Sequence, residues 1–202
     1  MVRISPIARK YYPELIWSVE TDEKVLFLTF DDGPTPHVTD WVLDQLKNYD
    51  AKATFFCLGK NVRDQPAIYQ RILDRGHAVG NHTFDHAKGW FTPTFAYLKS
   101  VLRCEKYVDS TLFRPPYGRI RKSQIRALLD RFRIVMWDVL SEDYNQSASP
   151  ESCLKKVISQ SKSGSIIVFH DSKKAQKNLS QVLPSVLDHF SSQGYVFRAL
   201  SI

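Results

Sequence analysis

The chain has 202 residues, of which 43% are hydrophobic and 24% are charged, and its net charge is +7. These values are typical of a folded globular protein and exclude a disordered or fibrous chain. No apolar run approaches the roughly 18 residues that a membrane helix needs, so we expect no transmembrane segment. The basic residues are dispersed and form no stripe with aromatic residues, so we interpret the charge as favouring solubility and expect no nucleic-acid partner.

The N-terminus and the cysteines bear on the cellular compartment. Residues 1–20 carry scattered charges and no continuous apolar core, which is not the pattern of a signal peptide. The cysteines at 57, 104 and 153 are odd in number and widely spaced, which favours reduced thiols over a disulfide framework. Both features favour a cytoplasmic location, although a periplasmic or secreted protein whose leader had been trimmed would look the same.

Short apolar runs alternate with amphipathic segments along the chain. We predict buried strands at residues 25–30, 53–58, 77–80, 111–113, 134–139, 165–169 and 195–200. We predict helices at residues 39–48, 65–75, 94–109, 122–131, 150–161 and 177–190. Strand–helix alternation repeated about seven times indicates a parallel sheet covered by helices. The first strand is followed by no Gly-x-Gly-x-x-Gly fingerprint, which favours a distorted, TIM-like (β/α) barrel of about seven strands over a dinucleotide-binding fold. We expect one domain, residues 21–202, with residues 1–20 as an extension packed on the barrel.

The first predicted strand ends on two adjacent carboxylates, Asp31 and Asp32, followed by Gly33 and Pro34. Strand ends in α/β folds carry functional groups because the backbone there is rigid and the side chains face an open mouth. Two acids at such a point repel each other unless a cation lies between them, and a metal ion is the simplest one. Asp-Gly-Pro is also ordinary turn chemistry, so this segment alone fits a solvated turn as well as a site.

Two histidines follow the third predicted strand. His82 and His86 are four residues apart, so they can approach one ion from the same side of a turn or helix. With Asp32 they would form a two-His, one-carboxylate site with positions open to water and substrate, which suits a divalent ion acting as a Lewis acid. A His-x-x-x-His pair is by itself more often a surface or capping feature, and its position directly after a strand is what favours the metal site.

Further polar groups follow the next three predicted strands. Arg114 precedes two prolines, which predict a rigid extended loop from which the arginine points toward the same mouth. Asp143 follows the fifth strand and His170 ends the sixth. Acid, base and cation thus recur at the same end of five strands, which chance placement explains poorly.

The ordered set of motifs resembles the NodB-homology polysaccharide deacetylases, carbohydrate esterase family four. The resemblance extends over about residues 25–200, and the set is far more specific than any one of its members. The segments that carry it are Thr29–Pro34, His82–His86, Arg114–Tyr117, Asp138–Tyr144 and Val168–His170.

The resemblance implies a metal-dependent hydrolase that removes acetyl groups from N-acetylated sugars, which would be its carbohydrate substrates. Asp32, His82 and His86 would hold the metal, usually Zn²⁺ and sometimes Co²⁺ or another divalent ion. A metal-activated water would attack the acetamide carbonyl, with Asp31 as general base and His170 as general acid.

The resemblance also implies three supporting roles. Arg114 would fix Asp31, Asp143 would pair with His170, and the Tyr117 N–H would help to bind the oxyanion.

Two positions depart from the family pattern. Tyr144 replaces a tryptophan and Val168 replaces a leucine, and both usually line the slot that receives the acetyl methyl group. The metal and proton chemistry are untouched by these changes, whereas acyl preference and substrate are left in doubt.

Two other functions fit the same residues. An acetyl ester hydrolase acting on O-acetylated polysaccharide would use this site, and a comparison of amide and ester substrates separates it from an N-deacetylase. A carbohydrate-binding protein with an inert site would bind sugar fragments and release no acetate. The polymer that is deacetylated, the native metal and the oligomeric state are not defined by the sequence.

Several polar or aromatic residues outside these roles are expected to be structural. His77 opens the third strand at the end opposite the mouth, Asp171 turns the chain after the sixth strand, and Asp138 is either an acid behind the site or a strand-end cap. His37 and Trp90 follow the acid pair and the histidine pair, so each has contact with substrate as its alternative role, Trp90 by stacking on a sugar face.

Overall fold

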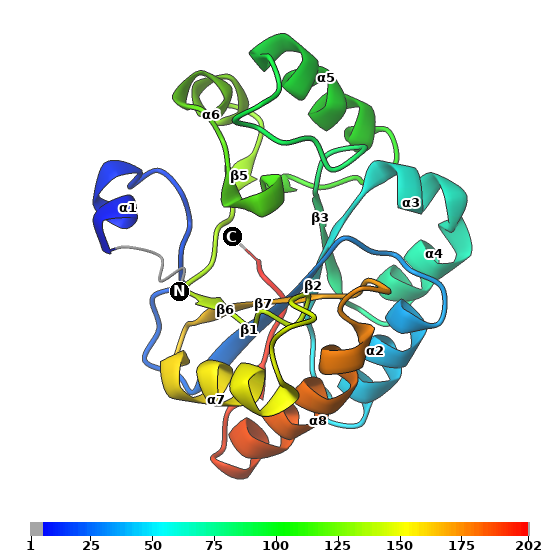
Figure 1. The fold of residues 1–202 in the computed structure, drawn as a ribbon, viewed down its shortest axis with the longest axis vertical. Coiled ribbons are helices and arrows are strands. Elements are labelled where there is room, and N and C mark those ends of the chain that lie inside the picture. Colours follow the sequence, from blue (N-terminus) through cyan, green and yellow to red (C-terminus); the bar gives the residue numbers. More distant parts are fainter. Residues whose placement is uncertain (1–5, 202) are drawn as a thin grey trace.

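The computed structural model describes residues 6–201, which form eight strands, eight α-helices and one 3-10 helix, η1 (Figure 1). The strands are β1 (Val25–Asp31), β2 (Thr54–Cys57), β3 (Ala78–Asn81), β4 (Leu112–Phe113), β5 (Arg133–Ile134), β6 (Val139–Leu140), β7 (Ile166–His170) and β8 (Val196–Phe197). The helices are α1 (Pro6–Tyr11), α2 (Val38–Lys47), α3 (Gly59–Asp64), α4 (Pro66–Asp74), α5 (Thr94–Glu105), η1 (Pro116–Gly118), α6 (Lys122–Leu128), α7 (Pro150–Gln160) and α8 (Gln176–Ser192). No helix in this part of the chain has the length and apolarity needed to cross a membrane.

The strands form one curled parallel sheet. Their order is β5-β4-β3-β2-β1-β7-β6, every neighbouring pair is parallel, and β8 pairs with the first residues of β1. Figure 1 shows the helices around the outside of this sheet. The TIM-like barrel that the strand–helix alternation predicts is therefore confirmed.

Alternation along β1 divides its buried side chains between the two faces of the sheet. The set that begins with Leu26 packs in the hydrophobic cluster shared with α2 and α8. The set that begins with Val25 packs in the second cluster. Because successive side chains of a strand point to opposite faces, Thr29 and Asp31 lie on the same face as Val25, inside the curl.

The N-terminal segment crosses the open side of the sheet. Of the predicted extension at residues 1–20, residues 1–5 lie outside the part of the chain that the structure describes. Both backbone groups of Ile16 are hydrogen-bonded to the end of β5 and the segment that follows it, and the Val19 N–H donates to the carbonyl of Gly164, just before β7. This segment therefore helps to close the barrel between β5 and β7.

The predicted strand at residues 134–139 is wrong in its extent. The chain forms two short strands there, β5 and β6, on opposite edges of the sheet. Between them the Val135 N–H donates to the carbonyl of Phe113, and the Asp138 N–H donates to the carbonyl of Ile166. An apolar run in the sequence cannot show that its hydrogen-bonding partner changes halfway along.

Candidate active site

The register of β1 against β7 brings the predicted base and the predicted acid together. Asp31 is paired with His170 at the carboxyl ends of these strands, and Thr29 is paired with Val168 two residues earlier. Residues two apart share one face of a strand, so the four side chains point into the barrel. Backbone pairing therefore fixes the relative position of the base and the acid.

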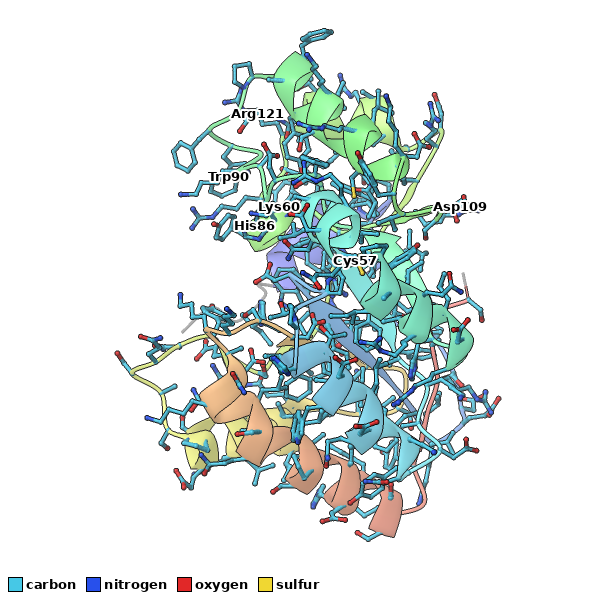
Figure 2. All side chains as sticks on the ribbon, turned by 90° about the vertical axis from the view of Figure 1, so that its right-hand side faces the viewer. Cys57, Lys60, His86, Trp90, Asp109 and Arg121 are labelled. Atoms are coloured by element: carbon cyan, nitrogen blue, oxygen red, sulfur yellow. The ribbon has the colours of Figure 1, made fainter. Side chains whose placement is uncertain are left out.

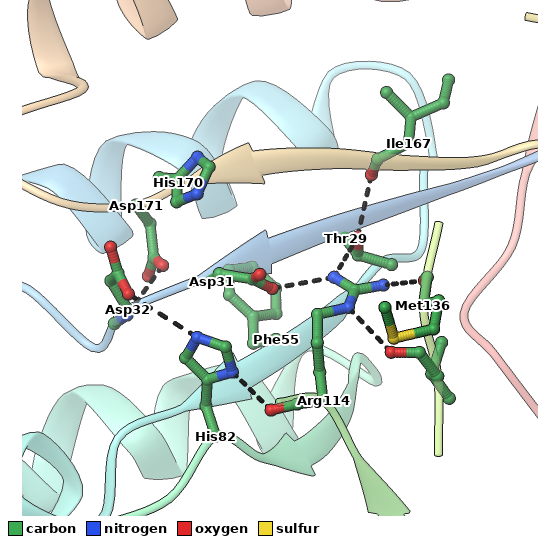
Figure 3. A network of polar contacts seen from close by, with 12 residues as sticks. Thr29, Asp31, Asp32, Phe55, His82, Arg114, Met136, Ile167, His170 and Asp171 are labelled. Atoms are coloured by element: carbon green, nitrogen blue, oxygen red, sulfur yellow. Dashed lines mark hydrogen bonds and ion pairs between the residues drawn. The ribbon is translucent and has the colours of Figure 1, made fainter. Parts of the chain in front are cut away.

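Arg114 holds Asp31 through a guanidinium that lies beside the carboxylate (Figure 3). The guanidinium is fully buried, and its NH1 donates to Asp31 Oδ1 at 2.8 Å and to Thr29 Oγ1 at 2.7 Å. Its other N–H groups donate to the carbonyls of Val135 (3.3 Å) and Met136 (2.9 Å). The prediction that Arg114 points toward the mouth is therefore wrong, because the side chain turns inward to satisfy its donors.

The contact with Arg114 sets the protonation state of Asp31. Burial alone would raise the pKa of this carboxyl, which is 4% exposed. The positive charge of Arg114, the largest of the opposing effects, outweighs burial and lowers the pKa below its ordinary value. Asp31 is therefore ionised at neutral pH, which is the form that accepts a proton.

Asp32, His82 and His86 converge on one point. Each offers one ligand atom, and these atoms lie within 4.8 Å of one another. Nε2 of His86 is 3.2 Å and Nε2 of His82 is 3.8 Å from Asp32 Oδ1. His82 Nδ1 lies 2.8 Å from the carbonyl oxygen of Arg114 and must donate to it, so the Nε2 lone pair faces Asp32 (Figure 3).

The donor set fits a divalent metal ion. Asp32 Oδ1 is buried and has no hydrogen-bond partner within residues 6–201, which is costly for a carboxylate unless a cation lies beside it. Burial first, and then the nearby imidazole of His82, lower the pKa of His86 to about 4, so this ring is neutral, as a metal ligand must be. Two imidazoles and one carboxylate are a ligand set that suits Zn²⁺.

Backbone strain is concentrated in the loops that carry these groups. Six of the seven non-glycine residues with positive φ, counted over the described part of the chain, lie in the loops after β1, β3, β4 and β6. Among them are Asp32 (φ 82°), Thr83 (φ 65°), His86 (φ 61°) and Tyr117 (φ 61°). Such conformations cost about 1–3 kcal/mol each and persist only where the surroundings hold them, which is characteristic of functional sites.

Asp143 holds His170 through both its ring and its backbone. Asp143 Oδ1 is 2.7 Å from His170 Nδ1, and Oδ2 accepts the His170 N–H at 2.8 Å. Burial would lower the pKa of His170, but the charge and hydrogen bond of Asp143 outweigh it and raise the pKa to about 9. Asn178 of α8 donates to the carbonyls of Asp143 and Asn145, which fixes the loop after β6. The imidazole is therefore protonated at neutral pH and can act as an acid.

Asp171, predicted only to turn the chain, also accepts two hydrogen bonds from distant residues. It is fully buried; Oδ1 accepts the Gly33 N–H at 3.0 Å, and Oδ2 accepts the hydroxyl of Thr39. A Cβ on Gly33 would lie 1.9 Å from Asp171 Oδ2, so only glycine fits there. Burial, with the charge of Asp32, raises the pKa of Asp171 to about 8. Asp171 therefore ties the loop that carries Asp32 to α2, and the sequence offered only its position beside the predicted acid as a signal.

A cavity of about 490 Å³ lies over these groups. All predicted site residues line it except Arg114 and Asp143, which lie behind Asp31 and His170. The wall also contains residues that sequence reasoning did not single out, namely Arg119, Trp137, Leu140, Ser172 and Lys174. They come from η1's flank, from the segment between β5 and β6, from β6 itself and from the loop after β7, so no single local pattern in the sequence predicts them.

Two tyrosines flank the candidate metal ligands and His170. The ring of Tyr117 lies 4.5 Å from that of His86, and the ring of Tyr144 lies edge-on to His170 at 4.9 Å. The predicted extended backbone is present at Pro115 (φ −71°, ψ 132°), and the chain then turns through the short 3-10 helix η1, which contains Tyr117. Among the hydrogen bonds of the described residues, none is donated by the Tyr117 backbone N–H, which leaves it able to bind a ligand oxygen.

Three further residues that the sequence analysis discussed, His77, Asp138 and His37, do not line the cavity. His77 is buried and its Nδ1 accepts the Ala53 N–H at 3.2 Å, as a core histidine does. Asp138 accepts from the hydroxyl of Ser165 at 2.7 Å and caps the start of β7, away from the cavity. His37 is exposed before α2 and does not line the cavity.

Known proteins resemble this chain over nearly its whole length. The polysaccharide deacetylase family model matches residues 18–132. The chain is 33% identical over 193 residues to a peptidoglycan-N-acetylglucosamine deacetylase of Bacillus cereus, and the match covers 92% of this chain and 90% of that protein. It is 34% identical over 203 residues to the peptidoglycan-N-acetylglucosamine deacetylase PgdA of Listeria monocytogenes, covering 96% of this chain but only 42% of that longer protein.

The same likeness appears among solved structures. A peptidoglycan N-acetylglucosamine deacetylase, Bc1960, solved in complex with an N-hydroxybenzamide compound, superimposes with a TM-score of 0.89 at 28% identity. The superposition covers 97% of this chain and 95% of that one.

Proposed function

The chain belongs to the polysaccharide deacetylase family, and from this premise we propose that it is a metal-dependent hydrolase that removes acetyl groups from the nitrogen of N-acetylated sugars. The observation that carries the proposal is the pairing of Asp31 with His170 beside the three converging ligands. The first of these groups is held ionised and the second protonated, which is the combination that amide hydrolysis requires.

The metal ligands in this proposal are Asp32, His82 and His86. A divalent ion bound there, Zn²⁺ by its ligand set, supplies Lewis acidity that polarises the acyl carbonyl and lowers the pKa of water. The hydrogen bond from His82 Nδ1 to the carbonyl of Arg114 keeps Nε2 directed toward Asp32, where the ion would be held.

The remaining chemistry is assigned to four groups of the chain. Asp31 accepts a proton from the attacking water, and Arg114 keeps its carboxylate ionised and fixed in place. The Tyr117 N–H donates to the oxyanion that develops on the acyl oxygen. His170 then donates a proton to the nitrogen as the C–N bond breaks, because an amide nitrogen does not leave as an anion.

The acetyl methyl group fits between Tyr144 and Val168 on the cavity wall. Tyr144 is half-buried against His170, and Val168 is buried on the inner face of β7. An apolar wall next to the proton donor binds a short acyl group and keeps water away from the developing charge.

Acetate release tests the proposal. N-acetylglucosamine oligomers of increasing length are compared with 4-nitrophenyl acetate, and Asp31→Asn serves as the control for non-enzymatic release. Acetate from the amide substrates above the control supports an N-deacetylase. Hydrolysis of esters alone indicates an acetyl ester hydrolase, and tight binding of the oligomers without any acetate indicates an inert carbohydrate-binding site.

A further inference from the structure

Every exposed tryptophan or phenylalanine side chain in residues 6–201 lies in the short segment that leads into α5. Trp90 is 52% exposed, Phe91 71% and Phe95 82%. Trp90 does not line the catalytic cavity but a separate apolar pocket of about 150 Å³, between the N-terminal segment and α6. In Figure 2 it lies on the same side of the molecule as His86 and Arg121. Large apolar side chains exposed together at one place mark an interaction surface.

Hydrogen bonds hold the backbone of this segment in place. The Gln124 side chain is buried, and its amide donates to the carbonyls of Gly89 at 2.9 Å and Thr92 at 3.3 Å. The carbonyl of Trp90 accepts two N–H groups from the guanidinium of Arg121. The exposed rings are therefore presented from an ordered backbone, which lowers the entropic cost of binding a partner.

Four exposed cationic side chains lie beside the exposed rings. The guanidinium of Arg119 lies 5.1 Å from the centroid of the Trp90 ring, and Arg121 is bonded to the backbone of the same residue. Lys88 precedes Trp90 by two residues, and Lys122 begins α6. None of the four forms an ion pair with a carboxylate of the described chain, so their charges are available to a partner.

The two segments that carry these cations contain no acidic residue. There is none between Asp85 and Glu105, and none between Asp109 and Asp130. The basic residues are dispersed along the sequence, and the fold brings these four together because the loop before α5 is hydrogen-bonded to α6 and to the residue before it. The positive charge around the rings is therefore not cancelled within either segment.

Charge and side-chain type together select the partner that fits this surface. A second copy of the chain, related by a two-fold axis, would bring the same cations face to face, which opposes association. Tryptophan and phenylalanine enter the boundary between the headgroups and the acyl chains of a bilayer, and lysine and arginine bind anionic headgroups. An anionic lipid surface satisfies both kinds of side chain at once.

We propose that the aromatic–basic surface, residues 88–95 and 119–122, docks on a bilayer that contains anionic phospholipid. Trp90, Phe91 and Phe95 enter the boundary between headgroups and acyl chains, while the four cations meet the lipid phosphates. Arg119 belongs both to this surface and to the cavity wall, so docking places the cavity beside the lipid. The contact is peripheral and needs no turnover, so it is independent of the proposed function.

Vesicle sedimentation tests the charge dependence. The full chain is mixed with vesicles of phosphatidylcholine, or of phosphatidylcholine with about 30% phosphatidylglycerol, in about 0.02 M and about 0.5 M NaCl. We expect binding to the anionic vesicles at low salt, and binding weaker by about tenfold or more at high salt or without phosphatidylglycerol. Lys88→Gln and Lys122→Gln each weaken binding about fivefold. Lys155→Gln is the control, because this exposed lysine lies on α7, at the opposite end of the molecule from α5 and α6 in Figure 1.

Substitution of the exposed rings tests the apolar part of the contact. Phe91→Ser combined with Phe95→Ser is expected to weaken binding about tenfold or more. Leu73→Ser is the matched control, because that side chain is 38% exposed on α4. Vesicles of brominated lipid are expected to quench the fluorescence of the wild-type protein strongly and that of Trp90→Phe weakly, although both bind, since the other tryptophans are buried or partly buried.

The outcomes separate lipid docking from its alternatives. Absence of binding to the anionic vesicles at low salt overturns the proposal. Binding that Lys155→Gln weakens as much as Lys122→Gln, or that the double phenylalanine substitution leaves unchanged, shows a general attraction of a cationic protein and overturns it too. Self-association that the double substitution abolishes, without vesicle binding, assigns the surface to a protein partner instead. Acetate release from soluble oligomers is measured without vesicles and reports on the proposed function alone.

Discussion

Two arginines five residues apart in the chain lie in opposite environments, Arg114 buried behind the cavity and Arg119 exposed on its wall. Arg114 is fully buried and donates to four acceptors, one of which is the carboxylate of Asp31. Arg119 lines the mouth, stacks against an exposed tryptophan and has no carboxylate partner within the described chain. The comparison shows that the buried arginine has its donors occupied by groups of the chain and fixes Asp31, whereas the exposed arginine pairs with no carboxylate of the described chain and keeps its charge available to a ligand.

The largest expected effect is on the rate of acetate release, from substitutions of Asp31 and His82. Asp31→Asn removes the base but leaves Asp32, His82 and His86 in place. We expect the rate of acetate release to fall by about 10²–10⁴-fold while the protein still binds zinc. His82→Ala, by contrast, is expected to lose both activity and bound metal. Initial rates and the zinc content of the dialysed proteins check both results, and a Asp31→Asn protein that turns over normally would contradict the role of Asp31.

The next largest expected effect is on the free energy of unfolding, which should differ between substitutions of Arg114 and Arg119. Arg114→Ala leaves the buried carboxylate of Asp31 without its counter-charge, which is expected to reduce the free energy of unfolding by about 3–5 kcal/mol. Arg119→Ala breaks no ion pair and is expected to change it by no more than about 0.5 kcal/mol. Urea unfolding of the three proteins measures this, and similar losses for the two variants would remove the contrast between the buried and the exposed arginine.

A smaller loss of stability is expected at Asp171. Asp171→Ala leaves the buried Gly33 N–H and the Thr39 hydroxyl without their acceptor, at a cost of about 1–3 kcal/mol. Asp171→Asn keeps one oxygen acceptor and is expected to lose less. Thermal unfolding of the two variants checks the order, and an equal loss would show that the hydrogen bonds are not what stabilises this loop.

The smallest effect concerns the pH profile. His170 must be protonated to act as the acid, so the rate should fall as pH rises through its pKa of about 9. Asp143 is the group that raises this pKa, and Asp143→Asn should therefore move the alkaline limb about one unit or more to lower pH. The profile of kcat/KM for both proteins measures the shift, and an unchanged limb would assign it to another group.

The sequence predicted the residues at strand ends well, because parallel strands bring their carboxyl ends to one edge. Asp31, Asp32, His82, His86 and His170 all line one cavity for this reason. The strand pattern does not show which way a side chain points once the chain has left the strand and entered a loop.

The missed features share this physical origin. Arg114 turns inward because its donors find carbonyls of the segment between β5 and β6, which is itself placed by contacts distant in sequence. The same segment was predicted as a single strand because its apolar run is continuous. Arg119 and Lys174 line one cavity only once separate loops are folded together, so no pattern along the chain predicts their shared position.

The central claim is that Asp32, His82 and His86 hold a divalent ion on which deacetylation depends. Its most direct test is acetate release from the N-acetylglucosamine tetramer before chelation, after chelation, and after Zn²⁺ is returned. We predict that chelation abolishes release by the wild-type protein, that Zn²⁺ restores it, and that His86→Ala is not restored at the same Zn²⁺ concentration. Undiminished acetate release by the metal-free wild-type protein would contradict the account.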